Sequence, residues 1–354
     1  MMTRRALLAG GASALALPAR AAAPGLRDLA AARGLIYGAA AASYELRDAD
    51  YPPLLAREAG MLVPEYEMKR HVVEPREGVF DFSGVDALMD FAATHGQAMR
   101  GHPLVWHAAN PPWLEEAVRA RRDTRLITSY IARVVSRYRG RFHSIDVVNE
   151  ALAEDGNGLR GSFWLDAFGS HYIDIAFHAA RAADPRALLV YNDYGCEAGP
   201  NDRQRANCLK LLDGLLARGV PVGAMGLQAH LSAFGPKVDR KKLAAFLREI
   251  EARGLALLVT EMDVDDEGGP WDSDTRDRAV ADEAARFLDV VLESRALAAL
   301  LTWGLSDRYL DPPQSLHLRL MGWRDRRLPY DAALAPKPLR AVLARAFSAR
   351  HTAF

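Results

Sequence analysis

Short apolar runs alternate along the chain with longer segments of helical spacing. The apolar runs are typical of buried strands, and most of them carry polar residues near their C-terminal ends. They cover residues 35–41, 61–66, 97–105, 144–152, 187–194, 224–231, 256–263 and 297–305. The segments between them repeat apolar positions every three or four residues and predict helices at residues 53–59, 86–95, 127–138, 162–183, 204–217, 243–252, 275–294 and 338–347.

This alternation predicts a parallel sheet, because each crossover between parallel strands needs a helix. Eight repeats in about 320 residues predict a single-domain α/β fold, the closed (β/α)8 or TIM barrel. An open doubly wound sheet is the alternative. The polar residues favour the barrel, in which all strand ends share one face where active sites lie. The residues at these ends are Glu65, His102, Asn149, Glu150, Tyr194, His230, Glu261 and Trp303.

Two of the predicted strands deliver a carboxylate in the same way. The stretch SIDVVNEAL ends its apolar run on Asn149 and Glu150, and the stretch ALLVTEMD ends its run on Glu261. A single glutamate at a strand end is more often a helix cap or a solvated loop residue. Two of them, with a histidine strand between and a tryptophan strand after, indicate a pair of carboxylates facing one bond, as hydrolysis of a glycoside requires.

Composition limits the classes of partner. Half of the 354 residues are hydrophobic, so the chain can bury a large core. Lysine plus arginine and aspartate plus glutamate number 45 each, so the overall charge gives no support to a nucleic-acid partner. The basic run at residues 119–125 is interpreted as a solvated loop.

The first residues have the layout of an export signal. Arg4 and Arg5 precede an apolar stretch at residues 6–17, which small residues follow. The arginine pair resembles a twin-arginine signal, and the apolar stretch is too short to span a bilayer comfortably. An uncleaved anchor is the alternative. We expect a signal at residues 1–23 and a catalytic domain at residues 24–354. The protein would then be exported by the twin-arginine route, periplasmic or secreted, and free of the membrane after cleavage.

The cysteine and histidine spacings predict no metal and no other cofactor. Cys196 and Cys208 fit no zinc pattern. An exported protein can form a disulfide, but we expect two separate thiols, because one lies in a predicted loop and the other in a predicted helix. His102 and His107 do not stack on one helix face, and no third ligand is evident.

A series of short motifs runs through nearly the whole chain after residue 23. They are PEYEMKR with EPREGVFDF, GHPLVWH, DVVNEAL, NDYG, GLQAHL, VTEMDV, TWGLSD and PKPL. In content and order they resemble glycoside hydrolase family 10, the family of barrel endo-β-1,4-xylanases. Any one of them alone would be a weak signal, but together they are a strong one.

The resemblance implies that Glu150 is the general acid/base and Glu261 the nucleophile of a retaining enzyme. This fits the chemistry, because the glycosidic oxygen needs a proton as it leaves and the developing oxocarbenium ion needs a negative partner. Strand alternation turns Asp263 the same way as Glu261, so Asp263 could fix His230 while that imidazole donates to Glu261. The family gives Asn149 a hydrogen bond to the sugar 2-hydroxyl. Taken alone, the histidine would be read as a core residue and the asparagine as a turn residue.

Sugar binding needs hydrogen-bonding side chains around the hydroxyls and flat apolar surfaces against the ring faces. By resemblance, the hydrogen-bonding role falls to Glu65, Lys69, His102 and Gln228. The flat surfaces are Trp106 and Trp303, with Tyr194 covering the leaving-group side. Either tryptophan could instead be ordinary core, but the positions at strand ends favour the site.

Three positions depart from the family pattern. Tyr66 stands where the family usually has Asn, Arg70 where it has Trp, and Leu310-Asp311 where it commonly has Ser-Trp. We expect these changes to alter the non-reducing side of the cleft, weakening its grip on plain xylan and favouring short or decorated chains.

The resulting prediction is a retaining endo-β-1,4-xylanase, expected as a monomer acting on xylan or xylo-oligosaccharides. Another barrel β-glycosidase, such as a β-glucanase or an arylglycosidase, is the alternative. A non-catalytic carbohydrate-binding protein on the same fold is a third reading, but it would lack one of the two carboxylates, and both are present.

Overall fold

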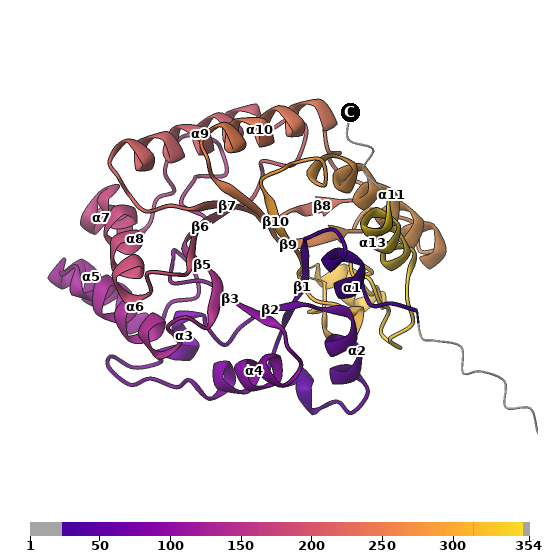
Figure 1. The fold of residues 1–354 in the computed structure, drawn as a ribbon, viewed down its shortest axis with the longest axis horizontal. Coiled ribbons are helices and arrows are strands. Elements are labelled where there is room, and N and C mark those ends of the chain that lie inside the picture. The colour runs from indigo at the N-terminus through magenta and orange to yellow at the C-terminus, as the bar shows by residue number, and fades with distance from the viewer. Residues whose placement is uncertain (1–22, 314, 350–354) are drawn as a thin grey trace, which may run out of the picture.

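The strands of the computed structural model, which describes residues 23–313 and 315–349, form one closed ring (Figure 1). They are β1 (Ile36–Ala41), β2 (Met61–Pro64), β3 (Ala98–Gly101), β4 (Val105–Trp106), β5 (Phe142–Asn149), β6 (Leu188–Asp193), β7 (Ala224–Leu227), β8 (His230–Ser232), β9 (Ala256–Asp265) and β10 (Leu297–Thr302). Each pairing between them is parallel, and β10 pairs with both β1 and β9, which closes the ring. The predicted (β/α)8 barrel is confirmed, and the open sheet is excluded.

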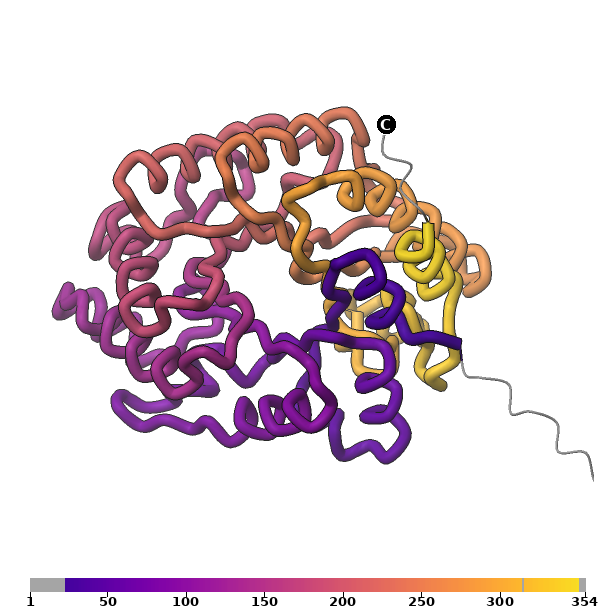
Figure 2. Tube along the Cα trace, viewed as in Figure 1, coloured from indigo at the N-terminus to yellow at the C-terminus, as the bar shows by residue number. Residues whose placement is uncertain are grey.

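Helices surround the ring of strands (Figure 1). They are α1 (Leu26–Ala31), α2 (Tyr51–Glu58), α3 (Arg70–Val73), α4 (Ser83–Thr94), α5 (Pro112–Arg121), α6 (Arg125–Arg137), α7 (Phe163–Phe168), α8 (His171–Ala183), α9 (Asp202–Ala217), α10 (Arg240–Ala252), α11 (Ser273–Val291), α12 (Leu316–Leu320) and α13 (Pro338–Ser348). Near the two ends of the chain, α1 and α13 pack side by side (Figure 2), which ties the first helix to the last.

The strands are apolar along both faces because helices cover the outside and side chains fill the inside. Met61 and Val63 belong to a small cluster of buried side chains, whereas Leu62 between them belongs to the large cluster that contains the helices. Alternate residues of a strand point to opposite faces. The small cluster is therefore the interior of the barrel, and the large one is the layer between barrel and helices.

The structure corrects the prediction for two segments, one expected to be a single helix and one expected to be a loop. The predicted helix at residues 162–183 is two helices, α7 and α8, because Gly169 adopts φ 60 and ψ −163, a conformation that breaks the helix and suits only glycine. The basic run at residues 119–125 is not a loop at its start, since α5 extends to Arg121. Its arginines are exposed and pair with neighbouring acids such as Glu77 and Glu115.

Two predicted strands are interrupted, and both interruptions lie at predicted site residues. The strand predicted at residues 97–105 splits into β3 and β4 around His102 and Pro103, and the proline has no N–H for a ladder. The strand predicted at residues 224–231 splits into β7 and β8, where Ala229 adopts φ 62. Each break turns the backbone out of the ladder, which aims the neighbouring polar side chains differently from those of a regular strand.

A buried ion pair lies in the interior of the barrel, close to the break between β3 and β4. Arg100 of β3 donates through two nitrogens to both carboxylate oxygens of Asp146 on β5, and both side chains are 0% exposed. His102 Nδ1 lies 2.8 Å from Asp146 Oδ2. The pair therefore connects the core of the barrel to the polar residues at the strand ends.

The two thiols are free and buried. Cys196 lies in the loop after β6 and Cys208 in α9, and a contact with Cys208 and burial raise the pKa of the Cys196 thiol well above its usual value. The structure thus agrees with the expectation of two unpaired thiols. Within residues 23–349, apart from the undescribed residue 314, none of the helices combines the length and the hydropathy needed to cross a bilayer. The predicted signal at residues 1–23 lies, except for its last residue, outside the described residues.

Replacing Arg100 by methionine should destabilise the protein strongly. The change leaves the buried carboxylate of Asp146 without its guanidinium, which costs about 3–5 kcal/mol in comparable pairs. Urea unfolding of Arg100→Met against wild type measures this cost. The matched control is Arg121→Met, which removes the exposed partner of Glu77 and should change little. Equal unfolding midpoints for Arg100→Met and wild type would contradict a structural role for the buried pair.

Candidate active site

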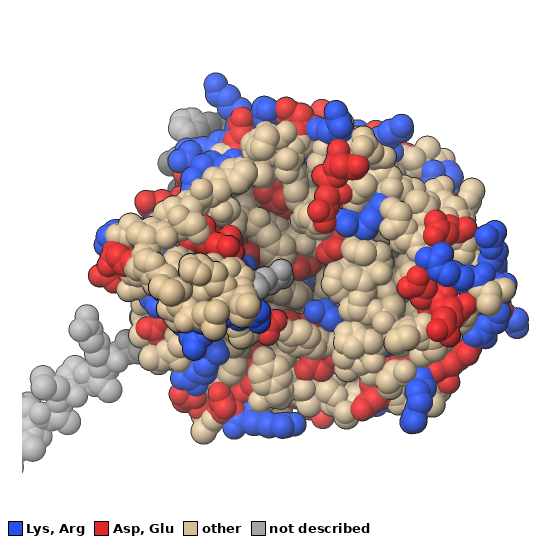
Figure 3. Space-filling view, turned by 180° about the vertical axis from the view of Figure 1, so that it is seen from behind, with Lys and Arg blue, Asp and Glu red and all other residues tan. Residues whose placement is uncertain are grey.

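The predicted site residues gather on the face of the barrel formed by the C-terminal ends of the strands. Most lie at such an end or in the loop that follows, namely Glu65, Lys69, His102, Trp106, Asn149, Glu150, Tyr194, Gln228 and Trp303. Glu261 and Asp263 lie within β9, beyond Val259, where its pairing with β7 ends, and His230 begins the short strand β8 that pairs with this extension. Figure 3 shows this face, which is hollowed, with acidic side chains around and inside the hollow. The fold thus collects in one place residues that lie far apart along the chain.

Glu261 is the most deeply placed of these acids, with a side chain 6% exposed. Its Oε1 accepts a hydrogen bond of 2.7 Å from Asn192 Nδ2, and His102 Nδ1 lies 3.8 Å from the same oxygen. His230 Nε2 lies 3.4 Å from Oε2. Burial raises the pKa of this carboxyl, but the positive charge of His102 and the contacts with His230 and Asn192 outweigh it and lower the pKa of Glu261 to about 2. The side chain is therefore a carboxylate at any ordinary pH.

His230 owes its own charge to a second acid. Its Nδ1 lies 2.7 Å from Asp263 Oδ1, on the opposite side of the ring from Glu261. Burial disfavours the charged imidazole, but the carboxylates of Asp263 and Glu261 outweigh it and raise the pKa of His230 well above 6.5. The imidazole is therefore protonated and offers an N–H to each acid, in the order that strand alternation predicts.

Asn192 of β6 connects the two halves of the site. Its Nδ2 donates to Asn149 Oδ1 at 2.8 Å as well as to Glu261, while its Oδ1 accepts from Thr260 Oγ1 at 2.7 Å. A Cβ on Gly226 would lie 2.3 Å from Asn192 Oδ1, so only glycine leaves room for this amide. The sequence prediction does not include Asn192, although a polar residue at the end of a buried strand is the signal that could have found it.

Glu150, immediately after β5, is held by three neutral donors. Its Oε2 accepts from Trp106 Nε1 at 2.8 Å, and its Oε1 accepts from Asn149 Nδ2 at 3.1 Å and Gln228 Nε2 at 3.0 Å. Because Asn149 also accepts from Asn192, one hydrogen-bond network joins Glu150 to Glu261. Trp106 and Gln228 therefore orient this carboxyl, beyond the sugar-binding roles that the resemblance implies.

The backbone of Glu150 is in the left-handed region, with φ 56. Such strain in a non-glycine residue persists only where the surroundings enforce it, and it is concentrated at functional sites. Arg160 Nε donates to the Glu150 carbonyl oxygen at 3.2 Å, and Arg160 Nη2 donates to Tyr194 Oη at 2.7 Å. Tyr194 in turn donates to Glu154. Arg160 thus holds the turn at Glu150. Sequence reasoning misses it because a loop arginine follows no periodic pattern.

The remaining predicted residues border the two carboxylates. Trp303 packs edge-on against His102, with ring centroids 5.3 Å apart. Lys69 Nζ lies 4.5 Å from the centroid of the Tyr66 ring. Burial raises the pKa of Glu65 to about 7, although a hydrogen bond from Tyr66 and the charge of Lys69 oppose this shift.

One group of side chains has the composition of a metal site. Among the described residues, it is the set in which His102, Asp146 and Glu261 each place a possible ligand atom within 4.8 Å of the others. Both oxygens of Asp146 are already paired with Arg100. A guanidinium therefore supplies the positive charge that a cation would bring, and the cluster is balanced without one.

Comparison with known proteins agrees with this geometry. The family model described as glycosyl hydrolase family 10 matches residues 25–346. The chain belongs to glycosyl hydrolase family 10. The resemblance predicted from the motifs is confirmed.

Two curated relatives of this chain are named as xylanases. Endo-1,4-beta-xylanase C of Paenibacillus barcinonensis is 34% identical over 344 residues, covering 88% of this chain and 31% of the relative. Endo-1,4-beta-xylanase A of Caldicellulosiruptor sp. is 35% identical over 275 residues, covering 72% of this chain and 39% of the relative. The chain therefore spans well under half the length of these two relatives.

The solved structures of similar proteins match over nearly their whole length. Xylanase 10B from Thermotoga maritima superposes with a TM-score of 0.81 at 28% identity, covering 91% of this chain and 98% of that one. Xylanase 10B from Thermotoga petrophila RKU-1, solved in complex with xylobiose, gives a TM-score of 0.82 at 28% identity, covering 93% and 98%.

The departures from the family 10 pattern lie in two different places. Tyr66 and Asp311 contact each other at 3.3 Å beside the carboxylate pair. Arg70, by contrast, is 5% exposed, stacks on the Tyr130 ring at 4.1 Å and pairs with Glu74. Its side chain packs against α6, where it also donates to the Leu126 carbonyl oxygen, so the guanidinium itself does not enter the cleft.

Replacing His230 by asparagine should move the ionisation of Glu261 towards neutral pH. Its pKa is depressed in the folded protein, so the carboxylate persists as pH falls until about 2. Losing one cation and its N–H raises that pKa, and the acid limb of inactivation by a 2-fluoro-xyloside with a good leaving group should shift upward by about one pH unit or more. The measurement is the inactivation rate against pH.

Two further variants serve as controls for the pH shift expected in His230→Asn. Asp263→Asn keeps the imidazole but weakens its charge, so it should give a smaller shift in the same direction. Glu261→Gln should take up no label at all. An acid limb at the same pH in His230→Asn and wild type would show that His230 does not set the charge state of Glu261.

Proposed function

We propose that this family 10 chain is a retaining endo-β-1,4-xylanase that hydrolyses xylan or xylo-oligosaccharides by double displacement. One observation carries the proposal: a buried carboxylate, Glu261, is kept ionised by two histidines and an amide, and the same hydrogen-bond network reaches a second acid, Glu150. The names of the relatives support the substrate class.

In the first step, Glu261 attacks the anomeric carbon while Glu150 gives its proton to the glycosidic oxygen. The bond between the anomeric carbon and that oxygen breaks, and the electron pair leaves with the oxygen as a neutral hydroxyl. The enzyme retains the sugar as an ester of Glu261. His102, His230 and Asn192 hold the attacking carboxylate in place, so little reorganisation is needed as its charge is consumed.

In the second step, Glu150 takes a proton from water, whose oxygen attacks the same carbon from the face that the leaving group vacated. The ester bond to Glu261 breaks, its carboxylate is regenerated, and Glu150 regains its proton. Two inversions give net retention. Trp106, Asn149 and Gln228 orient Glu150 in both steps.

Substrate binding follows from the polar and aromatic side chains around this pair. Glu65, Lys69 and His102 provide hydrogen-bond partners for hydroxyls, and Trp303 provides a flat surface. Tyr66 and Asp311, which depart from the family pattern beside the carboxylates, favour one alternative: a barrel β-glycosidase with other specificity, such as a β-glucanase or an arylglycosidase. A non-catalytic binding protein is disfavoured because both carboxylates and their supporting donors are present.

We also propose export and a monomeric state. The arginine pair and apolar stretch of residues 1–23 support a twin-arginine route to the periplasm or medium. Fusion of residues 1–23 to a reporter, with and without Arg4 and Arg5, tests the route. Sedimentation velocity of the protein without this segment tests the oligomeric state.

Product analysis on linear xylan, glucuronoxylan and cellulose tests the function. We expect short xylo-oligosaccharides from linear xylan, with the β-anomer formed first in proton NMR, and little release from cellulose. Faster hydrolysis of cellulose or of aryl glycosides alone would favour the alternative. Initial formation of the α-anomer would exclude retention.

Replacing Glu150 by alanine should slow the enzyme according to the leaving group. A dinitrophenyl xyloside needs no proton to leave, so its first step should be nearly spared, whereas xylo-oligosaccharides should lose about 10²–10⁴-fold in kcat/KM. Azide should rescue turnover of the activated substrate and yield a β-glycosyl azide. Equal losses on both substrates would exclude Glu150 as the acid. Trp106→Phe, which removes one donor to Glu150 but keeps a ring, is the matched control and should lose less.

A further inference from the structure

Two cavities flank the carboxylate pair. One is lined by Glu154 and Tyr194, on the side where Arg160 ties Tyr194 to the backbone of Glu150. The other is lined by Asp263, which contacts the partner imidazole of Glu261. In a double displacement the leaving group departs on the side of the acid, and the sugar that remains is held by the nucleophile. The second cavity therefore belongs to the sugars on the non-reducing side of the cleaved bond.

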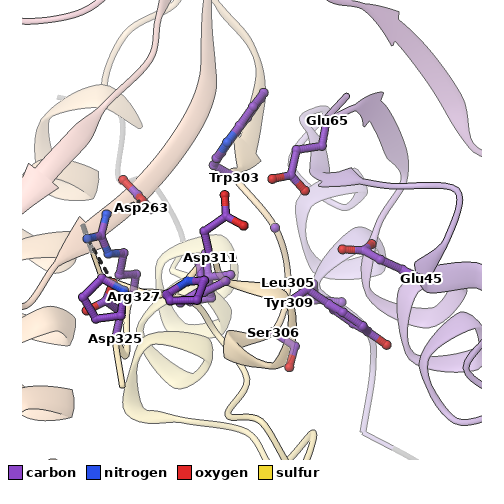
Figure 4. A pocket seen from close by; sticks show the side chains of 15 residues that line it. Glu45, Glu65, Asp263, Trp303, Leu305, Ser306, Tyr309, Asp311, Asp325 and Arg327 are labelled. Carbon is purple, nitrogen blue, oxygen red and sulfur yellow. Dashed lines mark hydrogen bonds and ion pairs between the residues drawn. The ribbon is translucent and has the colours of Figure 1, made fainter. Parts of the chain in front are cut away.

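This second cavity, of about 230 Å³, is strongly acidic. Its lining includes the acids Glu45, Glu65, Asp263, Asp311 and Asp325, and among the described residues that line it the sole basic side chain is Arg327. Figure 4 shows the carboxylates entering from different sides, with that of Asp311 pointing towards the space between Trp303 and Glu65. Burial raises the pKa of Glu45 to about 8 and that of Glu65 to about 7, so at neutral pH the potential that a bound sugar meets is set chiefly by Asp263, Asp311 and Asp325.

Three cations near the cavity do not cancel this excess. The protonated His230 lies between two acids, 2.7 Å from Asp263 and 3.4 Å from Glu261. Arg327 is already surrounded by acids: its Nη2 lies 2.8 Å from Asp265 and 3.2 Å from Asp325, and its Nη1 lies 3.7 Å from Asp263. Lys69 lies in the field of four carboxylates, namely Glu65, Glu261, Asp311 and Glu150. Each of the three cations is outnumbered by neighbouring acids, so none is available to pair with an acidic group on a ligand.

Asp311 is placed to dominate this potential. Unlike the buried Glu45, it is exposed at the cavity, and its Oδ2 accepts a hydrogen bond of 3.3 Å from Tyr66. That contact joins the loop after β10 to the loop after β2, across the end of β1, which lies between them in the ring. Its charge also contributes to the raised pKa of Glu65, which shows that the two carboxylates sense each other.

We propose that this cavity accepts a neutral sugar and rejects one that carries a carboxylate, with Asp311 as the residue that sets the discrimination. Hydroxyls of a neutral sugar find acceptors in Asp311 and Glu65. A uronic acid substituent instead adds a like charge to a partly desolvated, acid-lined space without a free cation, and such juxtaposition opposes binding. The proposal rests on the xylanase function proposed above. The proposal also specifies which decorated chains the enzyme prefers. Neutral substituents are tolerated in this cavity, and acidic substituents are not.

The test compares two xylo-oligosaccharides that differ only in charge. One carries a single glucuronic acid, and the other is its carboxyl-reduced form, which bears a neutral glucosyl group of the same size. Mass analysis of the products assigns cleavages that place the decorated unit in the cavity. For those cleavages, wild type should use the reduced form about tenfold better by kcat/KM, and added salt should shrink this ratio.

Two variants assign the effect to a charge. Asp311→Asn keeps the size and an acceptor for Tyr66 but removes the charge, so it should lower the ratio several-fold. Tyr66→Phe removes the same hydrogen bond and leaves the charge, so its ratio should stay near that of wild type. The ratio within each variant is the readout, which separates discrimination from any general loss of activity.

Three results would overturn the proposal. They are equal use of both oligosaccharides by wild type, an unchanged ratio in Asp311→Asn, or rejection of both decorated forms, which would assign exclusion to shape. If Asp311→Asn does not fold, the salt dependence of the wild-type ratio decides the question. Failure of the xylanase function itself would appear differently, as no cleavage of the undecorated oligosaccharide.

Discussion

A carboxylate kept ionised in a nearly dry place is the constraint on which the site depends. Glu261 is held in that state by His102 and His230, and each of these histidines faces a further acid. Behind His102 stands Asp146 with Arg100, and behind His230 stands Asp263. Basic and acidic side chains therefore alternate from the interior of the barrel to Glu261. Removing Arg100 would leave the fully buried carboxylate of Asp146 without its partner, which is costly in a medium of low dielectric.

The backbone geometry also helps to place the side chains of the site. The ladder of a regular strand would place every second side chain on one face, and that spacing cannot aim two acids and their donors at one sugar. The chain departs from regularity where this is needed: a left-handed residue at Glu150, another at Ala229, and a break at Pro103. Bonds such as that from Arg160 to the Glu150 carbonyl hold these turns. The strain lies at the site, and the packed barrel around it compensates for it.

The site is asymmetric in charge. On the side of Glu150, Arg160 ties together Tyr194 and Glu154, so a cation and an acid are paired there. On the side of Glu261, acids outnumber bases around the cavity that Asp311 enters. The same barrel therefore offers different environments to the two ends of a chain that crosses it. The loops determine this difference in charge, because the strands are similarly apolar all round the ring.

Much of the fold can be predicted from the sequence alone, because the spacing of apolar residues and the order of the segments can be read directly along the chain. The apolar runs predict eight strands in parallel order, and polar residues near their ends predict which face carries the site, so Glu150 and Glu261 can be chosen as candidates without coordinates. Gly169 and Pro103 are visible in the sequence too, but whether each ends an element depends on neighbours that the pattern does not contain. Only the tertiary structure determines the long-range partners. It brings Asn192 to Glu261 and the guanidinium of Arg160 to the Glu150 carbonyl oxygen. It also turns the Arg70 side chain away from the cleft and the Asp311 side chain into it. These contacts join loops and strands that are distant in sequence, and a side chain's direction there is set by packing and charge in three dimensions, which no spacing along the chain records.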